Sequence, residues 1–294
     1  MGVSELLQLL GDAIDDPEEE SFLLFTGPIP SSNLGFIDSK AKDIEISVNG
    51  QDLSIQQSPG LLTANLAGGT TGAVVWKVTP AFASWIADSE NILTKTLVIS
   101  PKSVVIELGS GVSGLVALTL GQQVAKYIAT DQSYVLKILR HNIESNWPSR
   151  KRSKLSKDWT TSLEILELDW ETTLTSDLPL LIPELQQAPS QAGGLDLIIA
   201  CDCIYNEALI PSFVSTCADL CGLRRKFSVE LESGMDAHPP TLCIIAQQLR
   251  SAVIFEEWLR VFHQKFNVWR IPDVMLSQDL KEGTGFVIHI GILR

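Results

Sequence analysis

The chain has 294 residues, of which 45% are hydrophobic and 19% are charged. This ordinary globular composition excludes a disordered, collagen-like or repetitive chain, and the length suits one large domain or a domain with an extension. The 22 Lys and Arg residues stand against 35 Asp and Glu residues, which gives a formal net charge of −13. Such acidity argues against nucleic-acid binding through general charge attraction and would favour a basic partner.

No segment of the sequence predicts a membrane span or a targeting signal. No run approaches the roughly 18 uninterrupted apolar residues of a membrane helix, and the N-terminus is acidic where a signal peptide is basic. Met1-Gly2 could begin a myristoylation motif, but Leu6 stands where Ser or Thr is needed. We therefore expect a soluble, cytoplasmic protein, with the nucleus as an alternative. The spacing of the five cysteines predicts reduced thiols and no zinc site: Cys201, Cys203, Cys217, Cys221 and Cys243.

The N-terminal part of the chain predicts a short helix and a hairpin. Residues 4–10 are amphipathic, and an acidic turn follows them. Residues 44–55 alternate apolar and polar side chains about Asn49-Gly50, a pair that tolerates the positive φ angles of a type I′ turn. We therefore expect a hairpin region over about residues 20–60. Residues 80–91 then predict a helix that begins at Pro80.

A repeating strand–helix pattern follows and predicts an α/β fold. The strand-like runs are short, apolar and rich in β-branched residues, which suits a sheet buried on both faces. Their alternation with helical periodicity implies parallel strands and right-handed crossovers, whereas the last two strands lack an intervening helix and predict an antiparallel pair. The expected strands are 103–108, 126–131, 164–170, 195–202, 241–247, 266–271 and 285–293, and the expected helices are 113–123, 133–146, 205–221 and 250–264.

The pattern also predicts how the chain is divided. We expect an N-terminal extension over residues 1–70, which carries the hairpin, and a main domain over residues 71–294. Two polar inserts interrupt the main domain, at 147–163 and at 222–240. The first insert is basic between residues 147 and 158, which predicts a solvated loop or, alternatively, a contact with an acidic partner or RNA. The second predicts a loop before the fifth strand.

A glycine-rich loop lies between the first strand of this pattern and the helix after it. Residues 107–114 read Glu-Leu-Gly-Ser-Gly-Val-Ser-Gly, so that Gly109, Gly111 and Gly114 form G-x-G-x-x-G. Glycine allows a sharp turn and the close approach of a ligand, and the helix N-terminus adds partial positive charge. Dinucleotide folds and S-adenosylmethionine folds both use such a loop, so the loop alone does not select between them.

Residues near the loop favour S-adenosylmethionine over NAD. Asp131 ends the second strand, where a carboxylate can bind the ribose hydroxyls of either cofactor. Glu107 would repel a pyrophosphate but tolerates a cationic amino-acid moiety. Asp169 can accept a hydrogen bond from an adenine amino group, and Trp170 offers an apolar wall. An NAD-dependent dehydrogenase remains an enzyme alternative with different chemistry.

Six short motifs follow one another within residues 70–293: Gly72-x-x-x-Trp76, Glu107-Leu-Gly-x-Gly111, Thr130-Asp131, Asn142-x-x-x-Asn146, Asp169-Trp170 and Asp202-x-x-Tyr205. This ordered set resembles the class I, seven-strand methyltransferases, and within them the family-16 protein lysine methyltransferases. The acidic start, the hairpin region and the Thr-Gly-Ala-Val-x-Trp sequence at 71–76 are most similar to the ribosomal lysine N-methyltransferase 5 subgroup. Members of that subgroup methylate a lysine of the large-subunit ribosomal protein L1. The two inserts depart from a minimal member.

The resemblance implies a Rossmann-like fold and a set of residues that bind S-adenosylmethionine. Gly109 and Gly111 would contact the amino-acid and ribose part through their backbone, and Glu107 would bond the methionine end. Asp131 would hold the ribose, while Trp170 would flank the adenine and Asp169 would orient it. Trp76 would close the methionine side, with core packing as the alternative, and Cys201 or Ala200 would line the pocket through its backbone.

The resemblance also implies where the acceptor lysine would bind. Methyl transfer to an amine depends mainly on proximity and alignment, and the lysine must first lose its proton because its free pKa is about 10.4. We expect Asp202 to orient or deprotonate the amine, with a helix N-cap as the alternative, and Tyr205, one helical turn later, to shape the lysine channel. Arg250 would fix the rim of the site or form a surface salt bridge. The four histidines are scattered and predict no metal site.

The sequence therefore predicts a protein-lysine N-methyltransferase that acts on a ribosomal protein, L1 being preferred. A lysine of an elongation factor or a chaperone is the alternative within the same chemistry. A non-catalytic S-adenosylmethionine-binding module for a basic partner is the alternative without chemistry. We expect a monomer that binds neither membrane nor nucleic acid directly.

Overall fold

The structure is a computed structural model. It describes residues 2–30, 35–62, 70–147, 162–182, 194–230 and 239–294. No helix among these residues is both long enough and apolar enough to cross a membrane. All five cysteines are buried free thiols, as the sequence predicts.

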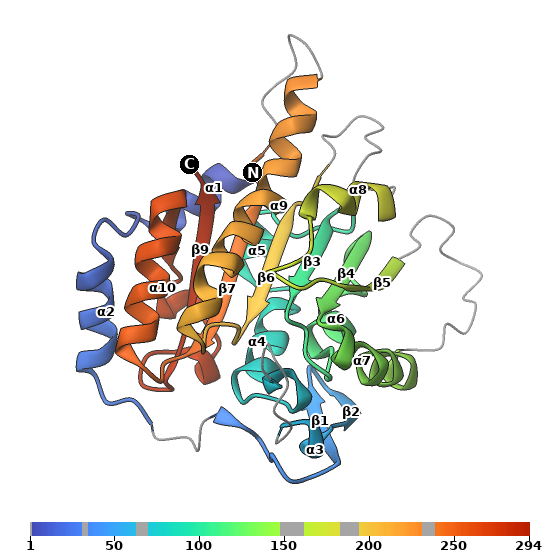
Figure 1. The fold of residues 1–294 in the computed structure, drawn as a ribbon. Coiled ribbons are helices and arrows are strands. Elements are labelled where there is room, and N and C mark those ends of the chain that lie inside the picture. Colours follow the sequence, from blue (N-terminus) through green and yellow to red (C-terminus); the bar gives the residue numbers. More distant parts are fainter. Residues whose placement is uncertain (1, 31–34, 63–69, 148–161, 183–193, 231–238) are drawn as a thin grey trace.

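A seven-stranded sheet in the order β5-β4-β3-β6-β7-β9-β8 forms the centre of the molecule (Figure 1). The strands β3 to β7 run parallel, and β9 pairs antiparallel with both β7 and β8. This topology confirms the predicted Rossmann-like sheet with its antiparallel C-terminal pair. The strands are β3 (Val104–Leu108), β4 (Lys126–Asp131), β5 (Ser162–Glu167), β6 (Leu197–Cys201), β7 (Leu242–Gln248), β8 (Phe266–Arg270) and β9 (Phe286–Leu293).

Helices cover both faces of the sheet, because successive side chains of each strand point to opposite faces. Val105 of β3 belongs to one buried cluster, together with α1 (Val3–Leu10), α4 (Val78–Ile86), α5 (Ile92–Lys95), α6 (Leu115–Leu120) and α7 (Ser133–Asn146). Ile106 belongs to the other cluster, together with α2 (Pro17–Thr26), α8 (Leu178–Leu181), α9 (Ile210–Glu230) and α10 (Ala252–Lys265). The result is a three-layer α/β/α arrangement. Short helices complete it: α3 (Pro59–Leu62), η2 (Thr71–Ala73), η3 (Thr175–Asp177), η5 (Glu207–Leu209), η6 (Asp273–Met275) and η7 (Gln278–Leu280).

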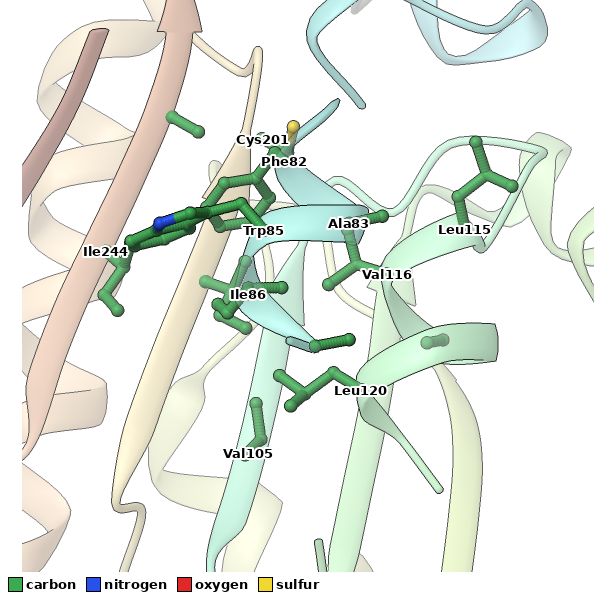
Figure 2. Close-up of a cluster of buried hydrophobic side chains, with 14 of the residues drawn as sticks. Phe82, Ala83, Trp85, Ile86, Val105, Leu115, Val116, Leu120, Cys201 and Ile244 are labelled. Atoms are coloured by element: carbon green, nitrogen blue, oxygen red, sulfur yellow. The ribbon is translucent and has the colours of Figure 1, made fainter. Parts of the chain in front are cut away.

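Figure 2 shows the core between α4, α6 and the sheet. Phe82 and Ile86 of α4 face the strands, and Leu120 of α6 lies beside them. The sulfur of Cys201, at the end of β6, lies next to Phe82 in this core. These side chains pack α4 and α6 against the sheet.

The predicted hairpin is confirmed. Strands β1 (Asp43–Val48) and β2 (Gln51–Gln56) pair antiparallel, and the two turn residues Asn49 and Gly50 have φ angles of 49° and 73°, as a type I′ turn requires. The side chain of Asn142 on α7 exchanges two hydrogen bonds with the backbone of Gln56, both 2.8 Å long. Asn146 bonds the backbone of Ser54 in the same way. The Asn-x-x-x-Asn motif thus attaches the hairpin to the main sheet domain.

Several predicted boundaries are wrong. The hairpin region does not begin near residue 20, because residues 17–26 form α2. Asp16 caps that helix by accepting a 2.8 Å hydrogen bond from the N–H of Glu18, and Pro17 occupies its first turn. These residues are typical of a helix start, but the sequence pattern resembles an acidic turn equally well. The helix predicted at 80–91 ends at Ile86. The third strand ends at Glu167 rather than at residue 170.

The first insert lies largely, and the second partly, outside the described residues. Residues 148–161 and 231–238 are not described. The loop predicted at 222–240 is wrong over its first part, because α9 continues to Glu230. The division at residue 70 stays a prediction, although α1 and α2 both bury side chains in the clusters of the main sheet.

Candidate active site

A cavity opens at the carboxyl ends of β3 and β6, the adjacent strands from which the chain continues to opposite sides of the sheet. Ligands of open α/β sheets bind at such a switch point. The cavity volume is about 820 Å³ including its open mouth, which suits a small-molecule ligand. The structure brings every site residue expected from the sequence to this cavity: Trp76, Glu107, Gly109, Gly111, Asp131, Asp169, Trp170, Cys201, Asp202 and Tyr205.

The glycine loop forms one wall and leaves no room for side chains. Gly109 has a φ of +67°, and a Cβ atom there would lie 2.7 Å from Sγ of Cys203 and 3.4 Å from the ring of Trp170. Gly111 has a φ of +61°, and its Cβ would lie 3.4 Å from the carbonyl oxygen of Gly72. Any other residue would be strained by these angles and would fill the wall. At Gly109 and Gly111 the loop therefore presents bare backbone to the cavity.

Glu107 and Asp131 are carboxylates with neutral partners. Glu107 is 2% exposed and accepts a 2.8 Å hydrogen bond from the hydroxyl of Tyr127. Asp131 accepts hydrogen bonds of 2.7 Å from the backbone N–H groups of Gly111 and Gln132. Burial raises the pKa of Glu107 to about 7 and that of Asp131 to about 6. Among the described residues neither forms an ion pair, so each can still neutralise a cation or bind a donor.

The charged residues in the lining of the cavity are all acidic. Five of its residues are acidic and none is Lys, Arg or His: Glu107, Asp131, Asp169, Glu171 and Asp202. A pyrophosphate would meet repulsion here, whereas a sulfonium, an α-ammonium or a lysine side chain would be attracted. This set of carboxylates fits S-adenosylmethionine and disfavours the dinucleotide alternative.

Asp169 and Trp170 lie on the loop that follows β5. Asp169 accepts a 3.1 Å hydrogen bond from Nε2 of Gln132 and a 2.9 Å bond from the N–H of Glu171. The Trp170 ring packs edge-on against Phe213 of α9, with ring centroids 5.0 Å apart. The carboxylate and the indole are thus fixed at the same side of the cavity, where the sequence places the adenine.

Asp202 is held by basic and backbone donors. Both carboxylate oxygens accept hydrogen bonds from Arg250, Nη1 to Oδ1 at 2.8 Å and Nη2 to Oδ2 at 2.5 Å, and Oδ1 also accepts from the N–H of Gln248. Only 1% of the Asp202 side chain is exposed, against 21% for Arg250. Arg250 therefore forms a partly buried ion pair with Asp202 rather than a surface salt bridge, and it is not among the residues that line the cavity. Its role at the rim stays a prediction.

The segment after Asp202 was expected to be helical, but it is not. Residues 203–206 form no helix, and the cap of the short helix η5 is Asn206, whose Oδ1 accepts a 3.1 Å bond from the N–H of Ala208. The helix-cap alternative for Asp202 and the helical turn between Asp202 and Tyr205 are therefore wrong. Tyr205 is half-buried at the cavity, and burial raises its pKa, so its hydroxyl stays neutral.

Some cavity residues were not singled out from the sequence. Tyr134, on the first turn of α7, lies within 3.5 Å of the Cβ position of Gly72. Cys203 donates from Sγ to the carbonyl oxygen of Leu108, 3.2 Å away, under the glycine loop. Cys203 lies inside the Asp202-x-x-Tyr205 motif, a signal that could have identified it. The described residues contain no His, Cys, Asp or Glu group arranged for a metal ion.

Comparisons with known proteins agree with this geometry. A family model described as lysine methyltransferase matches residues 55–238. The chain is 30% identical to Ribosomal lysine N-methyltransferase 5 of Vanderwaltozyma polyspora over 94% of this chain and 97% of that protein. It is 32% identical to the protein of the same name from Zygosaccharomyces rouxii, over 74% of this chain and 72% of that one.

Two further similarities are more distant in coverage or in structure. Diaminohydroxyphosphoribosylamino-pyrimidine deaminase of Schizosaccharomyces pombe is 28% identical over 87% of this chain, which spans only 53% of that relative. The crystal structure of the N-methyltransferase NodS from Bradyrhizobium japonicum, in complex with S-adenosyl-L-homocysteine, has a TM-score of 0.36 and 9% identity, over 72% of this chain and 92% of that one. The fold rests on the strand order itself. The family match, the relatives and the motif-bearing cavity together show that the chain belongs to the lysine methyltransferase family, whose cofactor is S-adenosylmethionine.

Proposed function

We propose that the protein transfers a methyl group to a lysine of a large-subunit ribosomal protein, L1, and that it does so in the cytoplasm as a monomer. The observation that carries the proposal is the acidic cavity, which combines a glycine loop with five carboxylates and no basic lining residue. Two kinds of cation would meet in it, the cofactor and the acceptor lysine. The two relatives named Ribosomal lysine N-methyltransferase 5 support the ribosomal target.

The cofactor side of the proposal assigns one task to each wall. Backbone atoms of Gly109 and Gly111 would lie against the cofactor, because no side chain intervenes there. Glu107 would compensate the positive charge of its methionine end, and Asp131 would accept from the ribose hydroxyls. The cofactor itself supplies a methyl group on a positively charged sulfur.

The acceptor side involves Asp202 and Tyr205. Of the two roles expected for Asp202, we favour orientation over proton abstraction, because its two oxygens pair with the cationic guanidinium of Arg250, whereas the partners of Asp131 are neutral. Tyr205 would shape the lysine channel with its half-buried ring. The carboxylates would draw in the lysine as its ammonium. With the cofactor bound their charge would be compensated, and burial would then favour the neutral amine, so the proton would leave to solvent through the open mouth before transfer.

The test is a methylation assay on ribosomes from cells that lack this gene, with the purified protein, radiolabelled S-adenosylmethionine and gel separation. We expect one labelled band with the mass of L1 that yields methyl-lysine on hydrolysis. The Asp131→Ala variant is the matched control, and it should give no band because its ribose contact is lost. A labelled elongation factor or chaperone in whole-cell extract, with unlabelled ribosomes, would overturn the ribosomal target. Cofactor binding without any label would indicate a non-catalytic module.

A further inference from the structure

An N-terminal segment lies against the wall of the cavity. The N–H of Ile37 donates to the carbonyl oxygen of Val75 at 3.1 Å, and the N–H of Lys77 donates to that of Gly35 at 2.8 Å. Phe36 and Trp76 thereby form an isolated antiparallel bridge. Val75 and Trp76 line the cavity, whereas residues 35–37 precede the part of the chain that the family model matches. The segment therefore adds a layer directly behind the site.

Three side chains stack behind this wall. The rings of Phe36 and Trp76 are tilted with centroids 4.4 Å apart, and Cζ of Arg250 lies 4.7 Å from the centroid of the Trp76 ring. A guanidinium over an indole face is attracted by the ring quadrupole. Arg250 also lies beyond the matched residues 55–238. Elements from both ends of the chain thus converge on one tryptophan of the cavity.

Gly35 makes the space in which Arg250 sits. Its φ is +92°, and a Cβ atom there would lie 2.5 Å from Nη2 of Arg250 and 2.3 Å from Oε1 of Gln248. Both are ends of flexible side chains, so a methyl group would displace them rather than unfold the segment. The backbone of residue 35 therefore passes directly over the guanidinium.

The seated guanidinium fixes a strained part of the site. Asp202 has a φ of +61°, which is uncommon for a residue other than glycine and persists only where surrounding contacts enforce it. Its two bonds from Arg250 and the backbone bond from its N–H to Ala246, 2.7 Å long, enforce it here. One side chain thus contacts both Trp76 and the residue that begins the turn to Tyr205.

We infer that Arg250 is a positioning residue of the methyl-transfer site. Residues 35–37 belong to that site because they hold the Arg250 side chain in place. The inference rests on the proposed function for its consequence, since the walls that Arg250 holds are those of the cofactor and of the lysine channel. Arg250 does not line the cavity, so it acts through Asp202 and Trp76. The N-terminal extension is then a structural part of the catalytic machinery.

The test compares Gly35→Ala, Arg250→Lys, Arg250→Ala and the double variant Gly35→Ala/Arg250→Ala in the full chain. The readouts are calorimetric binding of S-adenosylhomocysteine and amide hydrogen exchange of Asp202 and Gln248, whose N–H groups bond Ala246 and the Asp202 carboxylate. We expect Gly35→Ala and Arg250→Ala each to speed that exchange about tenfold and to raise the Kd about fivefold, with Arg250→Lys between them and the wild type. The double variant should match Arg250→Ala alone, because both changes disrupt the same interaction, that of the Arg250 guanidinium with Asp202 and Trp76.

Gly283→Ala is the matched control. Gly283 has a φ of +85° and no atom within 4 Å of its Cβ position, so it imposes similar backbone strain without touching Arg250, and both readouts should stay at the wild-type values. Additive effects in the double variant, or wild-type exchange and binding in Arg250→Ala, would overturn the inference. These readouts need no methyl acceptor. A wild-type protein that binds S-adenosylhomocysteine but methylates nothing would therefore contradict the proposed function and leave this test intact.

Discussion

Two buried carboxylate clusters in this molecule have opposite electrostatic characters. In the cavity, Glu107 and Asp131 have only neutral hydrogen-bond donors among the described residues, and burial raises their pKa values to about 7 and about 6. Between α2 and β9, Glu20 accepts a 3.1 Å hydrogen bond from Nε2 of His289 and lies 3.5 Å from Arg270. Burial acts to raise the pKa of Glu20, but His289 and Arg270 bring it below its ordinary value.

The difference separates a site that awaits a ligand from a contact that completes the fold. A buried carboxylate without a cationic partner costs folding free energy, and a protein retains one where a ligand supplies the missing charge. The Glu20 cluster already contains its partners and attaches α2 to the sheet. The comparison therefore predicts that mutations in the first cluster change binding and that mutations in the second change stability.

The largest effect should come from Glu107→Gln. The amide oxygen can still accept from Tyr127, so the change removes the charge and little else. We expect calorimetry to show a loss of cofactor affinity on the order of 100-fold, since a charge-assisted contact contributes roughly 1.5–3 kcal/mol. The ligand-free variant should melt at a higher temperature than the wild type at pH 8, because a buried unpaired charge is gone. Glu167→Gln, an exposed carboxylate on β5, is the control, and an unchanged affinity in Glu107→Gln would contradict its assignment.

Glu20→Ala should give the second largest effect and the opposite pattern. It removes the partner of a fully buried histidine, so we expect the free energy of unfolding to fall by about 2 kcal/mol with cofactor affinity unchanged. Denaturant unfolding and calorimetry measure the two quantities. Glu19→Ala changes the exposed neighbour on the same helix and should leave both near wild type. Loss of affinity in Glu20→Ala would mean that the two clusters are coupled.

The third prediction concerns pH and follows from the directions of the pKa shifts. A folded-state pKa raised above the unfolded value, as for Glu107, contributes stability that is complete below 4.5 and is lost as pH rises through about 7. The pKa of His289 is lowered by burial from 6.5, and that of Glu20 is lowered from 4.5, so their contribution is lost as pH falls below these values. Because Glu107 gains its negative charge over this range, cofactor affinity should rise about tenfold between pH 5.5 and pH 8.

Thermal unfolding of the ligand-free variants across this pH range checks the assignment. Glu107→Gln should flatten the decline of stability toward pH 8. Glu20→Ala should remove the loss below 4.5 that Glu20 causes and steepen the loss below 6.5, because Glu20 no longer acts to raise the pKa of His289. If both variants changed the same limb of the profile, the clusters would not differ as proposed.

The sequence predicted the parts of the molecule that depend on local pattern. The alternation of apolar runs located every strand of the sheet, and Asn49-Gly50 located the hairpin turn. The cavity residues were also predictable, because Glu107, Asp131 and Asp202 each follow or end a parallel strand, and such ends meet at one edge of a sheet. Their roles stay predictions.

The remaining features depend on pairs of residues far apart in the chain. Glu20 and His289 are 269 positions apart, and no periodicity links them. Gly35 meets Arg250 only because the segment before the hairpin crosses the end of β7. The start of α2 was missed because Asp16, Pro17 and the glutamates after them are equally typical of an acidic turn.

The smallest effect should come from Arg270→Ala, which shows which partner of Glu20 matters. Arg270 is 41% exposed and lies 3.5 Å from Glu20, whereas the His289 side chain is fully buried. An exposed ion pair contributes little because water and salt screen it. We therefore expect Arg270→Ala to lower the free energy of unfolding by no more than about 0.5 kcal/mol. This cost should vanish in roughly 0.5 M salt, because the ions screen the attraction between Arg270 and Glu20. A loss equal to that of Glu20→Ala would mean that the ion pair, and not the buried hydrogen bond, attaches α2 to the sheet.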